Sequence, residues 1–548
     1  MPENVRQWIA QQVERLSEEE RGLLEVASVM GADFTVAAVA AGLDRSMETV
    51  DATCATLVHD ERFLYSTDVE EWPDGTLGGR YAFRHALYAD VLYERVSEAR
   101  RVYLHRRIAE RKERAYGAQA DAIAAELAMH FAAGRDYAKA VTYYQFATRN
   151  ARQRSAHAEA MYLATKGLET LTCLPVATER LQHELTLQLT ISDILTVVNG
   201  FGTPEVARAF ARGRELCRQL GETPQIFRVL IGLWAHYVER AELSTAHELA
   251  TELLRLAPIL HAPRFFVWAH FTLGLTLYYQ GQLIIAREHL EQSLVNYESQ
   301  RPVNLQYDAA VLSCAHLGPV LWLLGYPEQA QQRSHEALRR ARALGQPYNV
   351  VYALDLALVT NWLLGAQSTI QQQQQELQKV AAESSFASYL ALAKVSGGAL
   401  IAEQRDPAAG ITQMRQSLAA WRETGAVAPQ PSYLALLAEM YGRVGRPKDG
   451  LVVLDECLAE EQCTGGRFFE AELYRLKGEL LLNAECKNMN AERKTKGEEP
   501  VSVSIHRSSF RVHRPVEAEE CFLKAIAIAQ QQHAKSLELR AMMSLVSH

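Results

Sequence analysis

The stretch GQLIIA, Gly281 to Ala286, decides the fold, because closely similar six-residue boxes recur along the chain. The related boxes begin at positions 241, 325, 365, 405 and 445 and read AELSTA, GYPEQA, GAQSTI, RDPAAG and GRPKDG. All the intervals between successive boxes are equal except the one before GYPEQA, which is slightly longer. A sustained period of this length is typical of stacked supersecondary units that bury their apolar faces against each other. The period therefore predicts a helical repeat array with an extended binding surface.

Each repeat has the same parts in the same order. An aromatic-rich helix comes first, such as FFVWAHFTLGLTLYY before Gly281, and an amphipathic helix, such as AREHLEQSLVNY, follows the box. Three boxes carry proline at the third position: Pro327, Pro407 and Pro447. Proline suits the first helical position, where its missing N–H has no partner in any case. The sixth residue is small except at Ile370, which predicts close approach of paired helices.

The repeat pattern extends beyond the six boxes. RDYAKA, Arg135 to Ala140, is an early copy, and HRPVEA, His513 to Ala518, is a late copy. One period after Gly445 would fall at position 485, so the late copy at His513 follows an insertion. We place this insertion near 483–512 and predict a charged loop, in which VSVSIHRSSFRV is a candidate hairpin arm. The sequence ends in mid-helix by pattern, so we expect that the array packs on something else or that the chain is cut short.

The first 115 residues follow a different pattern. SEEERGLLEVASVM, Ser17 to Met30, opens with a capping box of Ser17 and Glu20. Further helices are predicted over 36–41, 47–58, 86–95 and 98–114, and FLYSTDV and RYAFRH flank a turn-rich EEWPDGTLGG as a predicted β-hairpin. Three helices and such a wing indicate a winged-helix domain over 17–115, after a linker helix over 1–16. We thus predict a mainly α protein in which a TPR-like α-solenoid, a right-handed superhelix of helical hairpins, covers 120–548.

Composition excludes several classes of function. The chain has 57 Lys and Arg against 65 Asp and Glu, a net charge of -8, which disfavours a general nucleic-acid binder. The opening MPENVRQWIAQQVERL lacks the apolar segment of a signal peptide, and we read the apolar stretch Ala309 to Gly325 as a buried helix, so no membrane partner is expected. Eight scattered cysteines without a CxxC pair predict buried, reduced thiols in a cytoplasmic protein.

Several long segments resemble a known family. LSEEERGLLEVASVMGADF, YAFRHALYADVLYERV with RRVYLHRRIAERKE, and LKGELLL followed by AEECFLKAIAIAQQQHAKSLELRA resemble the C-terminal half of bacterial STAND-type signalling ATPases. These are predicted ATPases with tetratricopeptide-like (TPR) repeats, often found behind class III nucleotidyl cyclase domains or in transcriptional regulators. The resemblance implies a winged helix that holds an ATPase closed and repeats that sense a ligand or partner. The chain itself has no GxxxxGK[ST] P-loop, so the ATPase and any cyclase are absent from it and no cofactor is expected.

His85, in AFRHAL, is the one site residue that the resemblance singles out. It stands where the second predicted wing strand meets the next helix. In related apoptotic and plant-resistance ATPases a histidine at that junction contacts bound ADP, so the resemblance implies the same contact to an ATPase domain supplied separately. The structural alternative is a histidine that bonds the wing backbone or caps the helix.

Other candidate sites have plain structural explanations. The segment Asp44 to Arg62 of the winged helix carries a net charge of -3, which phosphates would repel. Acidic pairs such as Glu460 and Glu461 are interpreted as surface charge. The cysteines and histidines lack zinc-finger spacing, and neither GxSxG nor HExxH occurs, so no metal ion and no catalytic residue is predicted. The aromatic residues of the first helices are expected mainly to fill the core between repeats: Trp234, Tyr237, Trp268, Tyr278, Tyr279, Trp322 and Trp362.

Three functions follow for the chain. The first is a non-catalytic regulatory or scaffold module of a bacterial signal-transduction ATPase, which binds a protein or peptide on its repeats and passes the event to an ATPase or cyclase domain. The second is a fragment of a full-length ATPase or adenylate/guanylate cyclase. The third is a DNA-binding transcriptional regulator that uses the winged helix.

Overall fold

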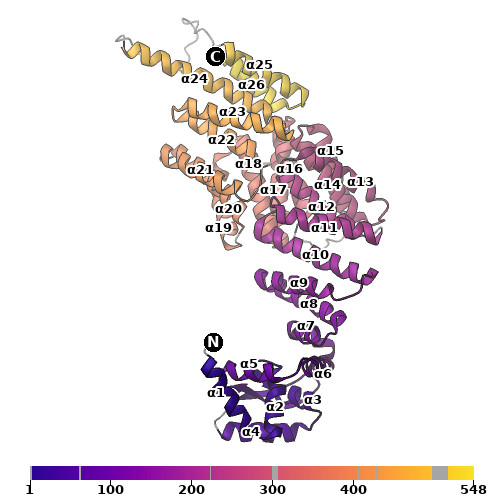
Figure 1. Cartoon of the computed structure of the whole chain (residues 1–548). Helices are drawn as coiled ribbons and strands as arrows, with labels where there is room; N and C mark the ends of the chain where they lie inside the picture. Colours follow the sequence, from indigo (N-terminus) through magenta and orange to yellow (C-terminus); the bar gives the residue numbers. More distant parts are fainter. Residues whose placement is uncertain are drawn as a thin grey trace. The chain divides into compact units, whose positions relative to one another are not determined.

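The computed structural model describes two compact units, Met1–Ile194 and Leu195–His548, within which helices predominate (Figure 1). The residues described are 3–60, 63–221, 224–298, 307–384, 386–404, 406–427, 430–495 and 516–547. The division falls inside one helix, whereas the sequence predicts a boundary between 115 and 120. That predicted boundary, and the winged-helix assignment of 17–115, stay predictions.

The first unit contains a small sheet among helices. Its elements are α1 Glu3–Glu14, α2 Glu18–Ser28, β1 Asp33–Thr35, α3 Val36–Leu43, α4 Met47–His59, β2 Leu64–Glu71, β3 Leu77–Phe83, α5 Ala86–Arg95, α6 Glu98–Tyr116, the 3-10 helix η1 Gly117–Ile123, α7 Ala124–Ala133, α8 Tyr137–Gln153 and α9 His157–Leu171, and α10 Thr178–Asn199 extends to the division.

Local capping sets the start of the first helices as predicted. The Ser17 side chain accepts from the Glu20 N–H, while the Glu20 carboxylate accepts from the Ser17 N–H at 2.8 Å, a complete capping box before α2. Thr35 and Ser46 cap α3 and α4 through their own side-chain oxygens. The five helices predicted between 17 and 115 are all present, as is the helix predicted for 1–16.

The predicted hairpin is present, and a third strand extends it. β2 and β3 pair antiparallel, with Leu64 opposite Phe83, and β1 pairs with the other edge of β3, giving the order β1-β3-β2. The short strand β1 was not predicted, because so brief a segment shows no alternation. The rings of Phe34, Tyr81 and Phe83 bring the sheet into one apolar cluster with α2, α3 and α6, which we call the N-terminal core.

The helices after η1 form a second cluster in this unit. Phe131 stacks on Tyr143 with ring centroids 5.6 Å apart, so α7 and α8 pack as a hairpin. Between α6 and α7 the Nδ1 atoms of His105 and His130 lie 2.8 Å apart. Burial, with a smaller contribution from nearby positive charge, lowers the pKa of both imidazoles to about 3, so the pair is neutral at neutral pH.

The second unit is helical throughout its described residues. After the end of α10 its helices are α11 Pro204–Leu220, α12 Gln225–Glu239, α13 Leu243–Leu256, α14 Pro263–Tyr279, α15 Leu283–Glu298, α16 Ala309–Leu323, α17 Pro327–Leu344, α18 Pro347–Leu364, α19 Gln367–Glu383, α20 Ala387–Gln404, α21 Pro407–Arg422, α22 Gln430–Arg443, α23 Pro447–Thr464, α24 Glu470–Thr495, α25 Val516–Gln531 and α26 Lys535–Ser547.

The described residues of all six boxes lie at a turn between two helices. The second residue of each box donates its N–H to the carbonyl five positions earlier over 2.8–3.0 Å, as Gln282 does to Leu277. This bond is the helix-ending pattern that requires a left-handed residue, and Gly281, Gly325, Gly365 and Gly445 supply it with φ between 70° and 94°. The third residue begins the next helix in all six boxes, so the predicted role of the three prolines is confirmed.

The early copy at Arg135 makes the same turn, and turns of this kind also occur where there is no recognisable box. Arg135 has φ 60°, and the following N–H bonds to the carbonyl of Phe131. Ser155 and His533 show a similar φ and the same bond without any glycine. The late copy lies in part outside the described residues, which resume at Val516.

The small sixth residue brings the paired helices into backbone contact. A Cβ on Gly410 would lie 2.5 Å from both the Ala402 nitrogen and the Gly398 oxygen, and one on Gly450 would lie 3.0 Å from the Ala438 oxygen. Interiors are packed too closely to absorb an added methyl group at such a point. The expectation of close helix approach is therefore confirmed.

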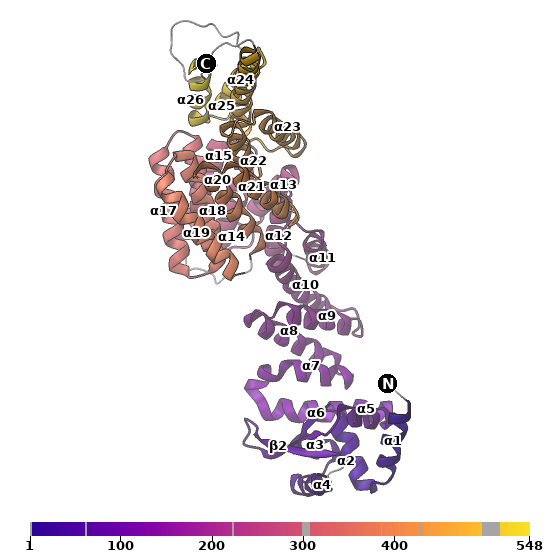
Figure 2. The same cartoon turned by 90° about the vertical axis from the view of Figure 1, so that its left-hand side faces the viewer.

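The first helices of the hairpins form a continuous inner layer, defined as α12, α14, α16, α18, α20, α22 and α24. Each helix of this series contacts the next. Later segments of the chain also contact the first helices of the layer. Val427 donates its N–H to the Glu239 carbonyl at the end of α12, and Arg467 donates its N–H to the Tyr279 carbonyl at the end of α14, at 2.8 Å. The two pairs have identical separations in sequence, so the array meets itself in a constant register. The helices α12, α14, α18, α20, α22 and α24 of the layer are labelled in Figure 2.

Two predictions about this unit need correction or completion. Residues 483–495, assigned to a loop, continue α24, because Leu480 and Leu482 extend its apolar face to the edge of that segment. The rest of the insertion, including the candidate hairpin arm, lies outside the described residues. The apolar stretch at 309–325 is the buried helix α16, as predicted. No helix among the described residues is both long and apolar enough to span a bilayer.

Candidate binding site on the inner layer

Tyrosines and ionisable side chains gather on the inner layer. On α18 the register i, i+4, i+7 sets three of them on one helix face. We define the inner cluster as Glu239 from α12, His316 from α16, Tyr348, Tyr352 and Asp355 from α18, Tyr389 from α20 and Tyr433 from α22.

Hydrogen bonds join these residues across helices. Tyr433 donates to Asp355, which lies far away in sequence. His316 Nε2 and the Tyr352 hydroxyl lie 2.6 Å apart, and the Tyr389 hydroxyl donates to that of Tyr348 at 3.3 Å. Rings extend the network, because Tyr307 and Phe386 both pack edge-on against Tyr348. The cluster therefore joins helices of the layer in one polar-aromatic network.

Burial changes the charge of this cluster. It raises the pKa of Asp355 to about 6, and it raises the pKa of Glu239 to about 7 with the Asp355 charge adding to the effect. Burial lowers the pKa of His316 to about 3, so its ring stays neutral, and its Nδ1 atom has no hydrogen-bond partner. Carboxyl groups kept near their titration point, beside an unsatisfied imidazole, are typical of functional sites.

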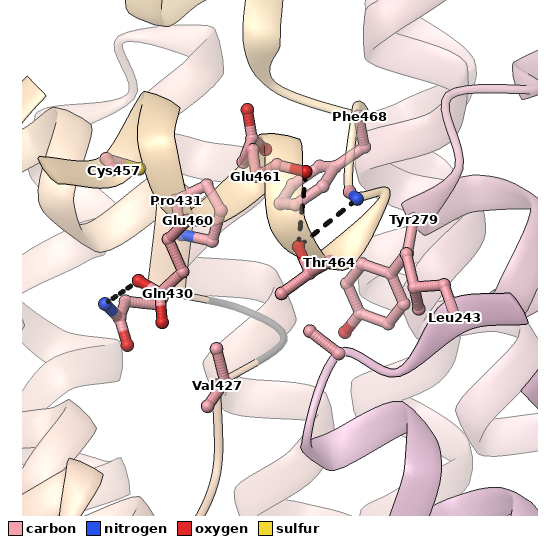
Figure 3. A pocket seen from close by; sticks show the side chains of 12 residues that line it. Leu243, Tyr279, Val427, Gln430, Pro431, Cys457, Glu460, Glu461, Thr464 and Phe468 are labelled. Carbon is pink, nitrogen blue, oxygen red and sulfur yellow. Dashed lines mark hydrogen bonds between the residues drawn. The ribbon is translucent and has the colours of Figure 1, made fainter. Parts of the chain in front are cut away.

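The described residues also line a pocket that is partly open to solvent, where the turn after α12 and the end of α14 meet α22 and α23 (Figure 3). The rings of Tyr279 and Phe468, whose centroids are 5.4 Å apart, line one side of the pocket. Glu460 accepts from Gln430 Nε2 at 2.9 Å. Glu461 lies beside it on α23, only 5% exposed, and neither of its carboxylate oxygens has a hydrogen-bond partner.

The prediction that Glu461 is surface charge is wrong. It follows Leu454 and Cys457 at helical spacing, so it falls on the buried face of α23. Burial, together with the charges of Glu470 and Glu460, raises its pKa to about 8, while Arg467 opposes this effect. The register alone would have found this residue. Nothing in the sequence marked Tyr348, Tyr389 or Tyr433, because they meet only when the array meets itself.

His85 lies in the first unit, at the position immediately before α5. Its backbone is extended and its side chain is exposed. His85 occupies the N-cap position of α5, but its imidazole makes no capping hydrogen bond to the helix, and its ring centroid lies 5.9 Å from that of Tyr88. The contact to ADP that the resemblance implies stays a prediction.

The remaining sequence candidates are distributed over both units. In the predicted DNA-contacting segment, Arg45 pairs with Glu19, and Asp44 pairs with Arg107 at 2.8 Å, while residues 61 and 62 lie outside the described ranges. All eight cysteines are free thiols, of which Cys173 and Cys463 are exposed, contrary to the expectation of burial. Among the described residues no group of His, Cys, Asp and Glu is arranged to hold a metal ion. Trp234, Tyr278, Tyr279 and Trp322 are buried as core residues, as predicted.

Comparisons with known proteins place the chain only broadly. No protein-family model matches it. An uncharacterized protein of Rhizobium meliloti (strain 1021) is 22% identical over 478 residues, which are 85% of this chain, and the chain spans 45% of that relative's length.

Solved structures with similar helix arrangements include three proteins of distant sequence. A Rap protein complexed with Competence and Sporulation Factor is 12% identical, with 72% of this chain and 99% of that one covered and a TM-score of 0.48. A STAND protein with a tetratricopeptide repeat sensor from Pyrococcus horikoshii is 11% identical, with 76% and 65% covered and a TM-score of 0.33. The APC/C heterotetramer Cut9-Hcn1 is 11% identical, with 83% and 92% covered and a TM-score of 0.37.

Proposed function

We propose that this chain is a non-catalytic regulatory module that binds a protein or peptide partner on the inner layer of a TPR-like array. The observation that carries the proposal is the inner cluster. Its residues come from α12, α16, α18, α20 and α22, with Tyr433 buried and the other three tyrosines half-buried. The pKa values of its two carboxyls are raised, and His316 Nδ1 has no hydrogen-bond partner. Such a surface recognises backbone and side-chain polar groups of an extended segment while aromatic rings supply apolar contact.

We further propose that the module serves a cytoplasmic ATPase or cyclase domain. The resemblance of residues 17–115 to a winged helix supports this, together with the three-stranded sheet and its helices. The exposed His85 then contacts the nucleotide of that domain. An in-frame P-loop in the genomic sequence upstream of Met1 is the expected finding, and an upstream region that encodes no nucleotide-binding domain contradicts this part of the proposal.

Selection of peptides from a random display library on the purified chain tests the binding function. Selected peptides are titrated against the wild type, Tyr389→Ala in the inner cluster and Tyr162→Ala, which changes a tyrosine of α9 that is 61% exposed. We expect at least a tenfold loss of affinity for Tyr389→Ala and no change for Tyr162→Ala. Equal affinities for the two variants, or micromolar ATP binding by the isolated chain, contradict the proposal.

A further inference from the structure

The pocket between α14, α22 and α23 contains an acid whose hydrogen bonding is incomplete. Both carboxylate oxygens of Glu461 are enclosed by protein and unpartnered, although nearly all buried polar groups in native structures are bonded. Its neighbour Glu460 bonds Gln430, and Glu472 on the next helix is held by Arg475 at 2.7 Å. Glu461 has no such partner and lines a pocket. We take this to indicate that its partner is a group from outside the chain.

The walls of the pocket favour a positively charged group. Two aromatic rings, of Tyr279 and Phe468, stand beside the acidic side chains, and among the described residues no Lys, Arg or His lines the pocket. Two nearby cations are engaged elsewhere: Arg467 pairs with Glu470 at 3.6 Å, and Arg422 donates to Gln430 at 3.2 Å. A carboxylate gives a cation a strong charge-assisted hydrogen bond, and ring faces attract the same charge.

We propose that this pocket binds a primary ammonium group carried on an alkyl chain, with Glu461 as its carboxylate partner. The same chemistry is found on a free amine and on a lysine side chain of a bound peptide. The inference deepens the proposed function, since a lysine in the partner would anchor it beside the inner cluster. It rests on that function only for the peptide source, because a free amine needs no partner protein.

Binding of a cation changes the protonation of the pocket. Burial holds the pKa of Glu461 at about 8, so the isolated side chain is mostly protonated at pH 7. The groups around it are Cys457 and Glu460 on α23, Arg467 and Glu470 on the turn into α24, and Tyr279 at the end of α14. Only Arg467 among them opposes protonation of Glu461. An ammonium that pairs with the carboxylate therefore expels a proton.

Calorimetric titration of the full chain tests the inference with three probes. These are 1,4-diaminobutane for the free amine, N-acetyl-lysine amide for the peptide source, and N-acetyl-norleucine amide as the uncharged control. The variants are Glu461→Gln and the matched Glu460→Gln, whose carboxylate lines the same pocket but already has a partner. We expect Glu461→Gln to lose at least tenfold in affinity for the ammonium probes and Glu460→Gln less than threefold.

The outcomes distinguish a free amine from a peptide lysine as the source of the ammonium group. A measurement on the wild type also keeps the test valid if a variant fails to fold. Tighter binding of the diamine assigns a free amine, and tighter binding of the lysine amide assigns a peptide. In the wild type alone, heats measured at pH 7 in buffers of different ionisation enthalpy must show proton release on binding. Binding of the norleucine amide as tight as that of the lysine amide, equal affinity in Glu461→Gln, or no proton release overturns the inference. Selected peptides that still depend on Tyr389 would then leave the proposed function standing.

Discussion

The N-terminal core and the inner layer differ in where their ionisable side chains lie. In the core, apolar residues such as Leu24, Phe34 and Leu104 are enclosed, and charged pairs such as Arg80 with Asp33 stay half-exposed. On the inner layer, carboxyls, an imidazole and tyrosines are drawn inside. Buried ionisable groups reduce stability unless they are fully paired. The difference indicates that the core is arranged for stability, and the less stable arrangement of the inner layer fits the proposed binding role.

The largest expected effect separates a paired buried acid from an unpaired one. Glu472 is bonded to Arg475 and lies 3.2 Å from Arg540, so Glu472→Met leaves the buried Arg475 with Glu479 as its remaining acid partner and should cost about 3 kcal/mol of unfolding free energy. Glu461→Met removes an acid that has no partner and should stabilise by about 1 kcal/mol. Urea unfolding measures both. Losses of similar size in the two variants would show that Glu461 is satisfied in the native protein.

A second, smaller effect concerns helix contact in the array. The added methyl of Gly410→Ala meets backbone atoms of α20 at 2.5 Å and should destabilise by about 1–3 kcal/mol. Gly22→Ala in α2 is the matched change beside the N-terminal core, where an added Cβ has no neighbour within 4 Å, and should stabilise by up to about 1 kcal/mol. Thermal melting of the two variants compares them. A Gly410→Ala melt at or above the wild-type temperature would mean that the hairpins do not depend on backbone contact.

The two units should also differ in how stability depends on pH. The folded pKa values of Asp355, Glu239 and Glu461, about 6, 7 and 8, lie above the ordinary values of 3.8, 4.5 and 4.5, so the native state holds extra protons in that window. Stability of the second unit is therefore lost as pH rises from about 5 through 8.

The first unit depends instead on neutral histidines. His105 and His130 have folded pKa values of about 3, below the ordinary 6.5, so its stability is lost only as pH falls below about 6.5. Hydrogen exchange, corrected for intrinsic rates, should show α18 losing protection between pH 6 and pH 8 while α3 keeps it. An equal change in both helices breaks the comparison.

The smallest effect tests the capping box of the N-terminal core. Ser17→Ala removes the side-chain acceptor for the Glu20 N–H and should cost about 1 kcal/mol, seen as faster exchange at the start of α2. Thr412→Ala in α21 is a suitable control, since its exposed hydroxyl bonds the Ala408 carbonyl within the same helix. Unchanged exchange in Ser17→Ala would show that the core fixes this helix without its cap.

Much of the architecture could be predicted from local sequence patterns. The box at Gly281, the prolines such as Pro407 and the capping box at Ser17 each act over a short span of chain, so turns and helix starts are predicted closely. The inner cluster was not predictable in this way. Tyr433 reaches Asp355, and Arg467 reaches Tyr279, only because distant parts of the array meet in the folded chain. Glu461 is the exception, because its helical register places it inward.

Hydrogen exchange of the full chain with and without a selected peptide tests the central claim most directly. If the inner layer is the binding surface, the peptide protects α18, α20 and α22 and leaves the N-terminal core unchanged. Protection confined to the core or to the outer helices, with no change in α18, would contradict that claim.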